Sequence, residues 1–345
     1  MGSPSGGLER FGTERFGMGW LQQRVVPYLQ LCRFAAVFTA IADIAAGLAL
    51  TGQLHPWRWS NLWLVLATVG LYLAGMSWND YFDREVDAVE RPRRPIPSGR
   101  VSLAQARWFA TGLMLLGWLG ACGAAWQSGQ GGPVVVAGLL TGAILWYDVI
   151  AKNHAWGPLV MGLCRFLNLL LGASLGLSLG TAVANETGVG AAVGRGVALG
   201  WLPWLVAAGN GLYIVGVTMF SRNETGQSPR AKLVRALVVA NLGLLILAAV
   251  QLGWPTGSAG RWLGNRTGPL LLWGLIAALI NRVAWGAIQN PAPQPVQLTI
   301  RTMLTSLILL DALVVLRATT NPWWSLGVVL LRYPAQWIGR RLAIT

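Results

Sequence analysis

Long apolar stretches recur along the chain and are separated by shorter segments rich in charged residues, Gly and Pro. A helix needs about 20 apolar residues to cross a bilayer, so this pattern predicts about nine membrane-spanning helices. The expected spans are 26–50, 62–83, 103–126, 133–151, 157–181, 199–220, 232–253, 268–288 and 299–319.

Two parts of the chain lie outside this pattern. An apolar stretch from Trp323 to Ile338 is interrupted by Arg332 and Pro334, and it fits either a tenth, short or broken pass or an interfacial helix. The first 24 residues have no continuous apolar core and predict a flexible cytoplasmic tail rather than a cleaved signal peptide. Since no internal repeat is evident, we expect one all-α transmembrane domain over residues 25–345.

Composition and charge agree with a polytopic membrane protein. Hydrophobic residues make up 54% of the chain, charged residues 11%, and the mean hydropathy is +0.52. With the amino end in the cytoplasm, most Arg and Lys residues fall in cytoplasmic segments, as the positive-inside rule requires. The loops after the second, fourth and sixth spans then lie on the same, cytoplasmic side. An anionic leaflet and an anionic substrate account for the net charge of +14, so no nucleic acid is needed to explain it.

The second span runs directly into an acidic segment that begins at Asn79. If the helix continues through this segment, Asp80, Asp83 and Asp87 share one face and Asn79 borders it. Carboxylates held this close repel one another unless a cation lies between them, and such oxygen clusters bind hard cations such as Mg²⁺ together with substrate phosphates. The segment therefore predicts a metal-bridged phosphate site at the membrane face. The alternative is a solvated acidic helix end.

A basic loop punctuated by prolines follows, with the sequence RPRRPIPSGRVS from Arg91 to Ser102. Together with the preceding Asn-Asp-x-x-Asp-x-x-x-Asp pattern, this loop resembles the first Asp-rich motif of the UbiA family of intramembrane prenyltransferases. The resemblance implies a bundle of about nine transmembrane helices around a central cavity. It also implies Mg²⁺-dependent transfer of a prenyl group from a prenyl diphosphate to a lipophilic acceptor within the membrane, at a site built from the loops after spans two, four and six.

Carried onto this chain, the resemblance assigns a metal-binding and a substrate-binding set of residues. The expected catalytic and metal-binding residues are Asp80, Asp83, Asp87 and Glu224, and the expected substrate-binding residues near them are Asn79, Arg91, Tyr147, Lys152 and Arg222. Of these, the side chains expected to bind the diphosphate are Arg91, Lys152 and Arg222.

The chain departs from the family pattern at two places. Tyr147 and Lys152 are five residues apart where the family has four, and Lys152 could instead form an i, i+4 ion pair with Asp148. After the sixth span the chain has Ser221-Arg222-Asn223-Glu224, with one carboxylate where the family has at least two. Arg222 could replace part of the missing metal charge, because a guanidinium binds phosphate oxygens in a bidentate manner.

Polar residues inside the spans also suggest function, because burying them is expensive. Arg165 and Asn168 are separated by three residues and share a helix face in the fifth span, where we expect them to line the acceptor pocket. The alternative is a buried structural pair, for example Arg165 with Asp43 or Asp311.

The leading functional hypothesis is intramembrane prenyl transfer by an enzyme whose partners are a prenyl diphosphate, a lipophilic acceptor and the surrounding lipid. The alternative is a UbiA-like protein that binds or moves a hydrophobic small molecule without prenylating it, which the reduced segment at Glu224 motivates. A secondary transporter is disfavoured by the lack of repeat symmetry.

Overall fold

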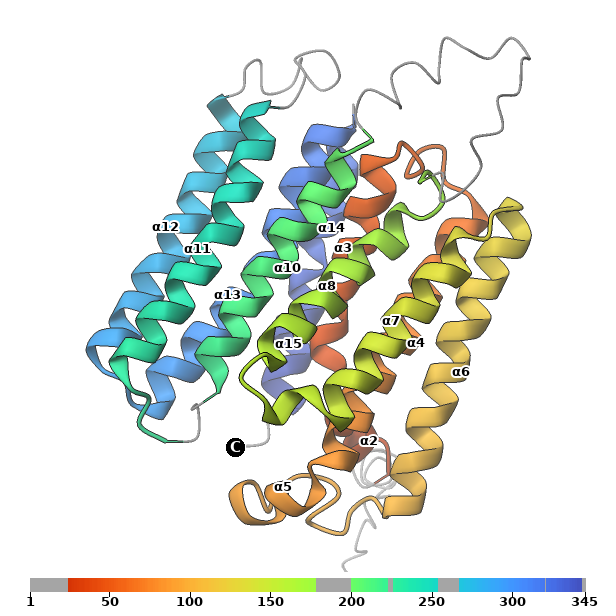
Figure 1. The fold of residues 1–345 in the computed structure, drawn as a ribbon. Coiled ribbons are helices and arrows are strands. Elements are labelled where there is room, and N and C mark those ends of the chain that lie inside the picture. Colours follow the sequence, from red (N-terminus) through yellow and green to blue (C-terminus); the bar gives the residue numbers. More distant parts are fainter. Residues whose placement is uncertain (1–23, 178–199, 223–225, 254–266, 320, 343–345) are drawn as a thin grey trace, which may run out of the picture.

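The structure is a computed structural model of the chain, and it describes residues 24–177, 200–222, 226–253, 267–319 and 321–342. All regular structure in this part of the chain is helical, and the helices form one bundle (Figure 1). In chain order the elements are α2 (Val26–Leu31), η1 (Phe34–Ala36), α3 (Val37–Leu50), α4 (Trp59–Phe82), α5 (Arg84–Glu90), α6 (Leu103–Ser128), α7 (Gly132–Val149), η2 (Ala151–Asn153), α8 (Gly157–Ala173), α10 (Leu202–Ser221), α11 (Arg230–Gly253), α12 (Thr267–Gln289), α13 (Pro293–Ala318), α14 (Pro322–Leu330) and α15 (Arg332–Leu342).

Local sequence signals set many of the helix ends. Proline occupies the first or second position of α7, α8, α10, α13 and α14, where its fixed φ suits the first turn and its missing N–H needs no partner. Ser102 begins α6 with a capping box, in which its side chain accepts from the Gln105 backbone and the Gln105 side chain accepts from the Ser102 backbone. Gly129 ends the same helix in the left-handed conformation that glycine adopts without strain.

Small residues let neighbouring helices approach closely. A side chain at Gly70 of α4 would collide with the backbone of Gly117 in α6, and one at Gly47 of α3 would collide with the backbone of α8 at Leu169. Helices in lipid associate through such close van der Waals packing, because lipid tails already satisfy apolar surfaces. The core of the bundle is built mainly from Ala, Leu, Val and Ile contributed by almost every long helix.

Seven described helices are long and apolar enough to cross a membrane: α4, α6, α7, α10, α11, α12 and α13. They correspond to seven of the nine expected spans. The first and fifth expected spans contain shorter apolar helices, Phe34–Leu50 and Gly157–Ala173. The first span is also interrupted before this segment, because Arg33 has a φ of 47° and separates α2 from η1. The all-helical membrane architecture is as expected, whereas a count of nine full-length spans is not reached in the part that the structure describes.

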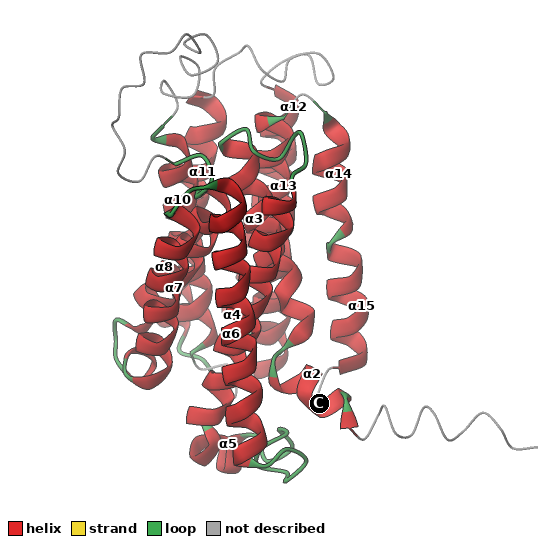
Figure 2. Cartoon of the chain, turned by 90° about the vertical axis from the view of Figure 1, so that its right-hand side faces the viewer, coloured by secondary structure: helices red, strands yellow, loops and turns green. Residues whose placement is uncertain are grey.

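The apolar stretch near the carboxyl end forms two consecutive helices, α14 and α15, that follow one another along one side of the bundle (Figure 2). The side chain of Gln30 in α2 donates a hydrogen bond to the carbonyl of Leu342 at 3.4 Å, so α15 ends beside the start of the described chain. This course favours a broken pass over a helix lying across the end of the bundle.

Candidate active site

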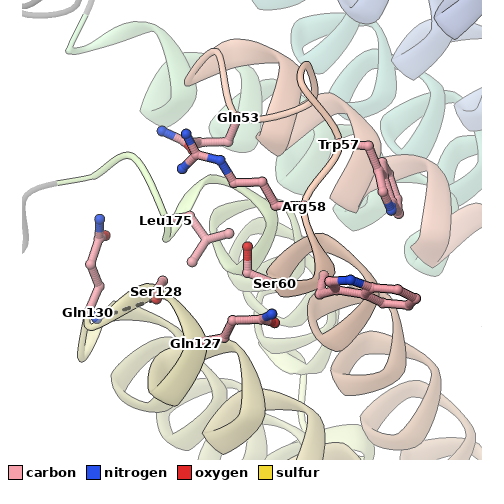
Figure 3. A pocket seen from close by; sticks show the side chains of 9 residues that line it. Gln53, Trp57, Arg58, Ser60, Gln127, Ser128, Gln130 and Leu175 are labelled. Atoms are coloured by element: carbon pink, nitrogen blue, oxygen red, sulfur yellow. Dashed lines mark hydrogen bonds between the residues drawn. The ribbon is translucent and has the colours of Figure 1, made fainter.

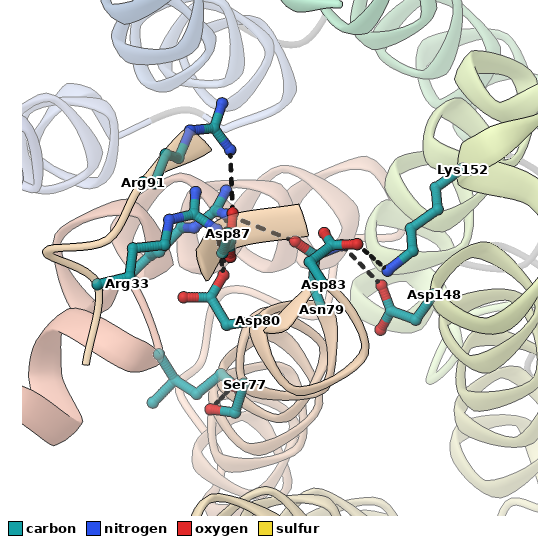
Figure 4. A network of polar contacts seen from close by, with 11 residues as sticks. Arg33, Ser77, Asn79, Asp80, Asp83, Asp87, Arg91, Asp148 and Lys152 are labelled. Carbon is teal, nitrogen blue, oxygen red and sulfur yellow. Dashed lines mark hydrogen bonds and ion pairs between the residues drawn. The ribbon is translucent and has the colours of Figure 1, made fainter. Parts of the chain in front are cut away.

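The acidic segment does not form one unbroken helix. α4 ends at Phe82, Asp83 occupies the cap position with a ψ of 2°, and α5 begins at Arg84. Backbone hydrogen bonds from Asp83 to Asn79 and from Asp87 to Asp83 continue the turn across this break. The expectation that all three aspartates lie on one helix face is therefore wrong. Asp80 and Asp87 point to one place, whereas Asp83 points toward η2 (Figure 4).

One arginine joins Asp80 and Asp87. The Nη1 atom of Arg94 lies 3.0 Å from Oδ1 of Asp80 and 2.5 Å from Oδ2 of Asp87, so a single cationic atom bridges two carboxylates. Both aspartates are buried, and Arg94 is largely enclosed. Burial raises the pKa of the Asp87 carboxyl above its ordinary value, and the charge of Arg94 opposes that rise.

Arg94 is presented by a loop that is ordered by its own hydrogen bonds. The carbonyl of Arg94 accepts from the backbone of Ser98 at 3.0 Å, and the carbonyl of Pro95 accepts from the backbone of Val101 at 3.0 Å. Gly99 takes a φ of 73° where the loop turns back, a value that favours glycine. The basic loop is thus a rigid support for the Arg94 side chain.

Two further arginines form ion pairs with the same carboxylates. Arg33, at the break between α2 and η1, places Nη2 3.1 Å from Oδ1 of Asp80. Arg91 places Nη1 3.7 Å from Oδ1 of Asp87. Both arginine side chains are partly exposed. Asp80 and Asp87 therefore each have a second, more exposed arginine partner in addition to Arg94 (Figure 4).

The third aspartate binds the loop after α7. Nζ of Lys152, in η2, lies 2.5 Å from Oδ1 of Asp83. The ion pair with Asp148, the alternative considered for Lys152, is replaced by this contact, because α7 ends at Val149 and Lys152 belongs to the next element. Asp148 instead accepts a hydrogen bond from the side chain of Asn79 at 3.2 Å.

The loop after α10 reaches the same region. The guanidinium of Arg222 donates to the carbonyls of Lys152, at 3.4 Å, and of His154. The Ser221 hydroxyl donates to the carbonyl of Thr218 in its own turn, at 3.0 Å. Tyr147 lies half-buried within electrostatic reach of Asp83 and Arg222. The loops after α4, α7 and α10 therefore converge at one end of the bundle; Asn223 and Glu224 lie outside the described residues.

The arrangement of these side chains limits how a divalent metal could bind. Among the described residues, no three Asp, Glu, His or Cys side chains gather closely enough to hold one metal ion. Asp80 and Asp87 nevertheless converge on one cationic atom, and carboxylate oxygens are the ligands that Mg²⁺ prefers. These two residues fit a cation placed between them, whereas Asp83 would have to leave Lys152 to join it.

Comparison with known proteins identifies the family. Residues 36–294 match the UbiA prenyltransferase family. The chain belongs to this family. A digeranylgeranylglyceryl phosphate synthase of Methanopyrus kandleri is 43% identical over 97 residues, which cover 26% of the chain and 32% of the relative. The bacteriochlorophyll synthase 33 kDa chain of Rhodobacter capsulatus is 36% identical over 115 residues, which cover 30% of the chain and 36% of the relative. The chain thus spans about a third of the length of the curated relatives it matches.

Solved structures confirm the UbiA fold. A UbiA homologue from Aeropyrum pernix K1 superposes with a TM-score of 0.59 at 18% identity, covering 80% of this chain and 97% of the other. A UbiA homologue from Archaeoglobus fulgidus bound to GPP and Mg²⁺ gives a TM-score of 0.56 at 15% identity, covering 88% and 99%. At these identities the likeness shows the fold of this UbiA family member.

Arg165 and Asn168 are buried in α8, and their partners are other residues than Asp80, Asp83 and Asp87. Nε of Arg165 is 2.8 Å from Oδ2 of Asp43, and Nη2 is 4.0 Å from Oδ2 of Asp311. Asn168 donates to Asp43 at 2.8 Å and accepts from Thr68 at 2.6 Å. The structure thus shows the buried pair that was the alternative reading of these residues; a role in acceptor binding stays a prediction.

A pocket of about 480 Å³ lies at the opposite end of the bundle from the aspartates, between the loop that joins α3 to α4 and the end of α6 (Figure 3). Its lining is formed by Gln53, Trp57, Arg58, Trp59, Ser60, Gln127, Ser128, Gln130 and Leu175. None of the residues predicted for the active site contributes to it.

Sequence reasoning did not select two residues of the site. Arg94 is one of several arginines in the basic loop, and residue spacing alone does not tell which of them turns back toward Asp80. Arg33 lies inside the first expected span, 26–50. Its position at a helix break, 47 residues before Asp80, could not be read from a span pattern that runs through it.

Proposed function

We propose that this UbiA family member transfers a prenyl group from a prenyl diphosphate to a lipophilic acceptor within the membrane. The observation that carries the proposal is the meeting of three loops around three aspartates, each bound by at least one cationic side chain. The named relatives support it, since they are synthases, and one solved homologue is bound to GPP and Mg²⁺ and another structure of that homologue to DMAPP and Mg²⁺.

The charge of the site suits a diphosphate. A prenyl diphosphate carries about three negative charges, and breaking the bond between its first carbon and oxygen concentrates charge on the leaving group. Arg33 and Arg91 have partly exposed guanidinium groups beside the aspartates, and the largely buried Lys152 binds Asp83. These side chains would bind the diphosphate oxygens and stabilise the leaving group as the bond breaks.

Mg²⁺ is the cofactor that we propose, and Asp80 and Asp87 are the residues that would hold it, with Asp83 and Glu224 as further proposed ligands. When bound, the metal would act as a Lewis acid that neutralises the departing diphosphate. The apolar bundle would exclude water from the allylic cation, so that the acceptor forms the new bond and then loses a proton.

Diphosphate release tests this proposal. Purified protein in lipid nanodiscs, given Mg²⁺, prenyl diphosphates of several lengths and a membrane lipid extract, is expected to release diphosphate and to stop when the metal is chelated. The acceptor product would be identified by mass spectrometry. Binding of a prenyl diphosphate without release would instead support the second candidate, a UbiA-like protein that binds or moves a hydrophobic molecule. That candidate is favoured by the single carboxylate of the segment from Ser221 to Glu224.

A further inference from the structure

We propose that Arg94 is an internal counter-cation that holds the place of the metal between Asp80 and Asp87, and that it moves to the diphosphate when the metal enters. The inference rests on the proposed function, because it concerns the same site. It makes Arg94 a substrate-binding residue that couples the binding of the metal to the binding of the diphosphate.

The first support is the geometry of the bridge. A guanidinium has five N–H donors and usually spreads them over its partners. Here one nitrogen, Nη1, serves both Oδ1 of Asp80 and Oδ2 of Asp87, at 3.0 and 2.5 Å. The two carboxylates come from different helices, α4 and α5, and converge on that one atom. The point between them is therefore a position for a cation.

The second support is the electrostatic need for a cation at that point. Asp80 is 4% exposed and Asp87 is 2% exposed, and two such carboxylates close together destabilise each other's charged form. Arg33 pairs with Asp80 and Arg91 pairs with Asp87, whereas Arg94 bridges the two carboxylates. Without Arg94, another cation has to occupy the gap.

The third support is the way in which Arg94 is mounted. The backbone of its loop is held by the hydrogen bonds of Ser98 and Val101, and Arg100 donates to the carbonyl of Arg93 at 2.6 Å. The long side chain can therefore change partners while the loop stays in place. A guanidinium released from two carboxylates binds well to a diphosphate, whose oxygens match its planar donors.

Competition follows from this arrangement. A divalent ion and Nη1 of Arg94 cannot occupy the same point, so metal alone has to displace a buried ion pair. Metal arriving with a diphosphate supplies the released guanidinium with a new anion. Metal and diphosphate should therefore bind cooperatively, and by linkage each should strengthen the other by the same factor.

Titration calorimetry tests the proposal with Mg²⁺ or Mn²⁺, in the absence and presence of a non-hydrolysable prenyl diphosphate. In the unmodified protein we expect the diphosphate to raise metal affinity by roughly tenfold or more. In Arg94→Gln we expect metal alone to bind about tenfold more tightly, because the competitor is gone, and the gain from diphosphate to shrink by a similar factor. Arg107→Gln, an exposed arginine that lies over Trp108 on α6, is the matched control and should behave as the unmodified protein.

The outcomes separate the two proposals. If the unmodified protein binds neither metal nor the diphosphate in any combination, the proposed function fails. If it binds both without cooperativity, or if Arg94→Gln binds metal alone no more tightly than the unmodified protein, the role of Arg94 is wrong while the function stands. Should Arg94→Gln not fold, Arg94→Lys keeps the charge but loses the planar fork; it should retain weak binding of metal alone and lose affinity for the diphosphate.

Discussion

Two clusters of aspartate and arginine in this bundle differ in their balance of charge. The first cluster lies at the loop end, the end of the bundle where the loops after α4, α7 and α10 converge. There, three aspartates meet four cationic side chains, Arg33, Arg91, Arg94 and Lys152. In the middle of the bundle, two aspartates, Asp43 and Asp311, share one arginine, Arg165. The first cluster has an excess of cations and the second an excess of carboxylates.

Access to solvent differs in the same way. At the loop end, the side chains of Arg33 and Arg91 are 42% and 31% exposed, so water or an incoming anion can reach them. In the core, Asp43 and Asp311 are fully buried, and neutral groups complete the network, among them the amide of Asn210, which donates to Asp311 at 2.8 Å. Similar ion pairs therefore have two different roles in this bundle. Those among the loops can exchange their partners for ligands, whereas those in the core fix the packing of α3, α8, α10 and α13.

The largest effect is expected in the core. Arg165→Gln leaves Asp43 and Asp311 buried without a cationic partner, and breaking a buried pair in this way typically costs about 3–5 kcal/mol. The free energy of unfolding in mixed detergent micelles should fall by that amount.

Adding Asp43→Asn to Arg165→Gln should recover a large part of the loss, since it removes one of the unpaired carboxylates. Arg282→Gln, on the exposed face of α12, is the control and should change stability little. An Arg165→Gln protein as stable as its parent would mean that the core network is not structural, and the contrast between the two clusters would disappear.

The second prediction concerns the loop end. Asp80→Asn removes a carboxylate that binds Arg33 and Arg94, and with it a proposed metal ligand, so diphosphate release should fall at least about a hundredfold. Stability should change less than in Arg165→Gln, because Arg33 is partly exposed to solvent and Arg94 keeps its ion pair with Asp87.

Glu85→Gln is the matched control for Asp80→Asn, since the Glu85 side chain is 84% exposed in the neighbouring helix α5. It should keep turnover unchanged. Turnover of Asp80→Asn near that of the parent would remove the first acidic motif from the mechanism.

Much of the fold could be predicted because hydrophobicity and charge act over whole segments. The apolar spans predicted the long helices. The alternation of basic loops predicted that the segments after α4, α7 and α10 lie on one side of the bundle, and the contacts Asp83–Lys152 and Arg222–His154 bring these segments together. Helix breaks were not visible in this pattern. Arg33 interrupts the first expected span although its neighbours are apolar.

The site was predicted less well, for a physical reason. Spacing rules such as i, i+4 hold only while a helix continues. α4 ends one residue before Asp83, and α7 ends before Lys152, so these two residues pair with each other across the site instead of with neighbours along their own helices. The partner of Asp80 and Asp87, Arg94, is set by the turn of a loop, which residue spacing does not encode.

The third prediction tests the loop after α10. Arg222 donates to the carbonyls of Lys152 and His154, and such charged hydrogen bonds contribute about 1.5–3 kcal/mol each where they are well formed. Because the Arg222 guanidinium is exposed, we expect Arg222→Ala to weaken binding of a non-hydrolysable prenyl diphosphate by only about tenfold, through a displaced Lys152.

Arg222→Lys should lie between the parent and the alanine variant, because it keeps the charge and loses the fork. Calorimetric titration measures both. Unchanged affinity in Arg222→Ala would mean that the loop after α10 is not part of the site. The site would then be formed by the loops after α4 and α7 alone.

The smallest effect should come from the neutral groups that enclose the core cluster. Thr68 donates to Oδ1 of Asn168 at 2.6 Å, and Asn168 in turn donates to Asp43 at 2.8 Å. Thr68→Val keeps the shape of the side chain and removes one buried hydrogen bond, so the free energy of unfolding should fall by about 1 kcal/mol. Diphosphate release should stay at the parental level, because Thr68 contacts the core network and not the loop end. The same mixed-micelle unfolding assay, run beside Thr111→Val at a partly exposed position of α6, measures the difference. If Thr68→Val lowers turnover without lowering stability, the core cluster is part of the reaction chamber, and Arg165 and Asn168 return to the acceptor site first expected of them.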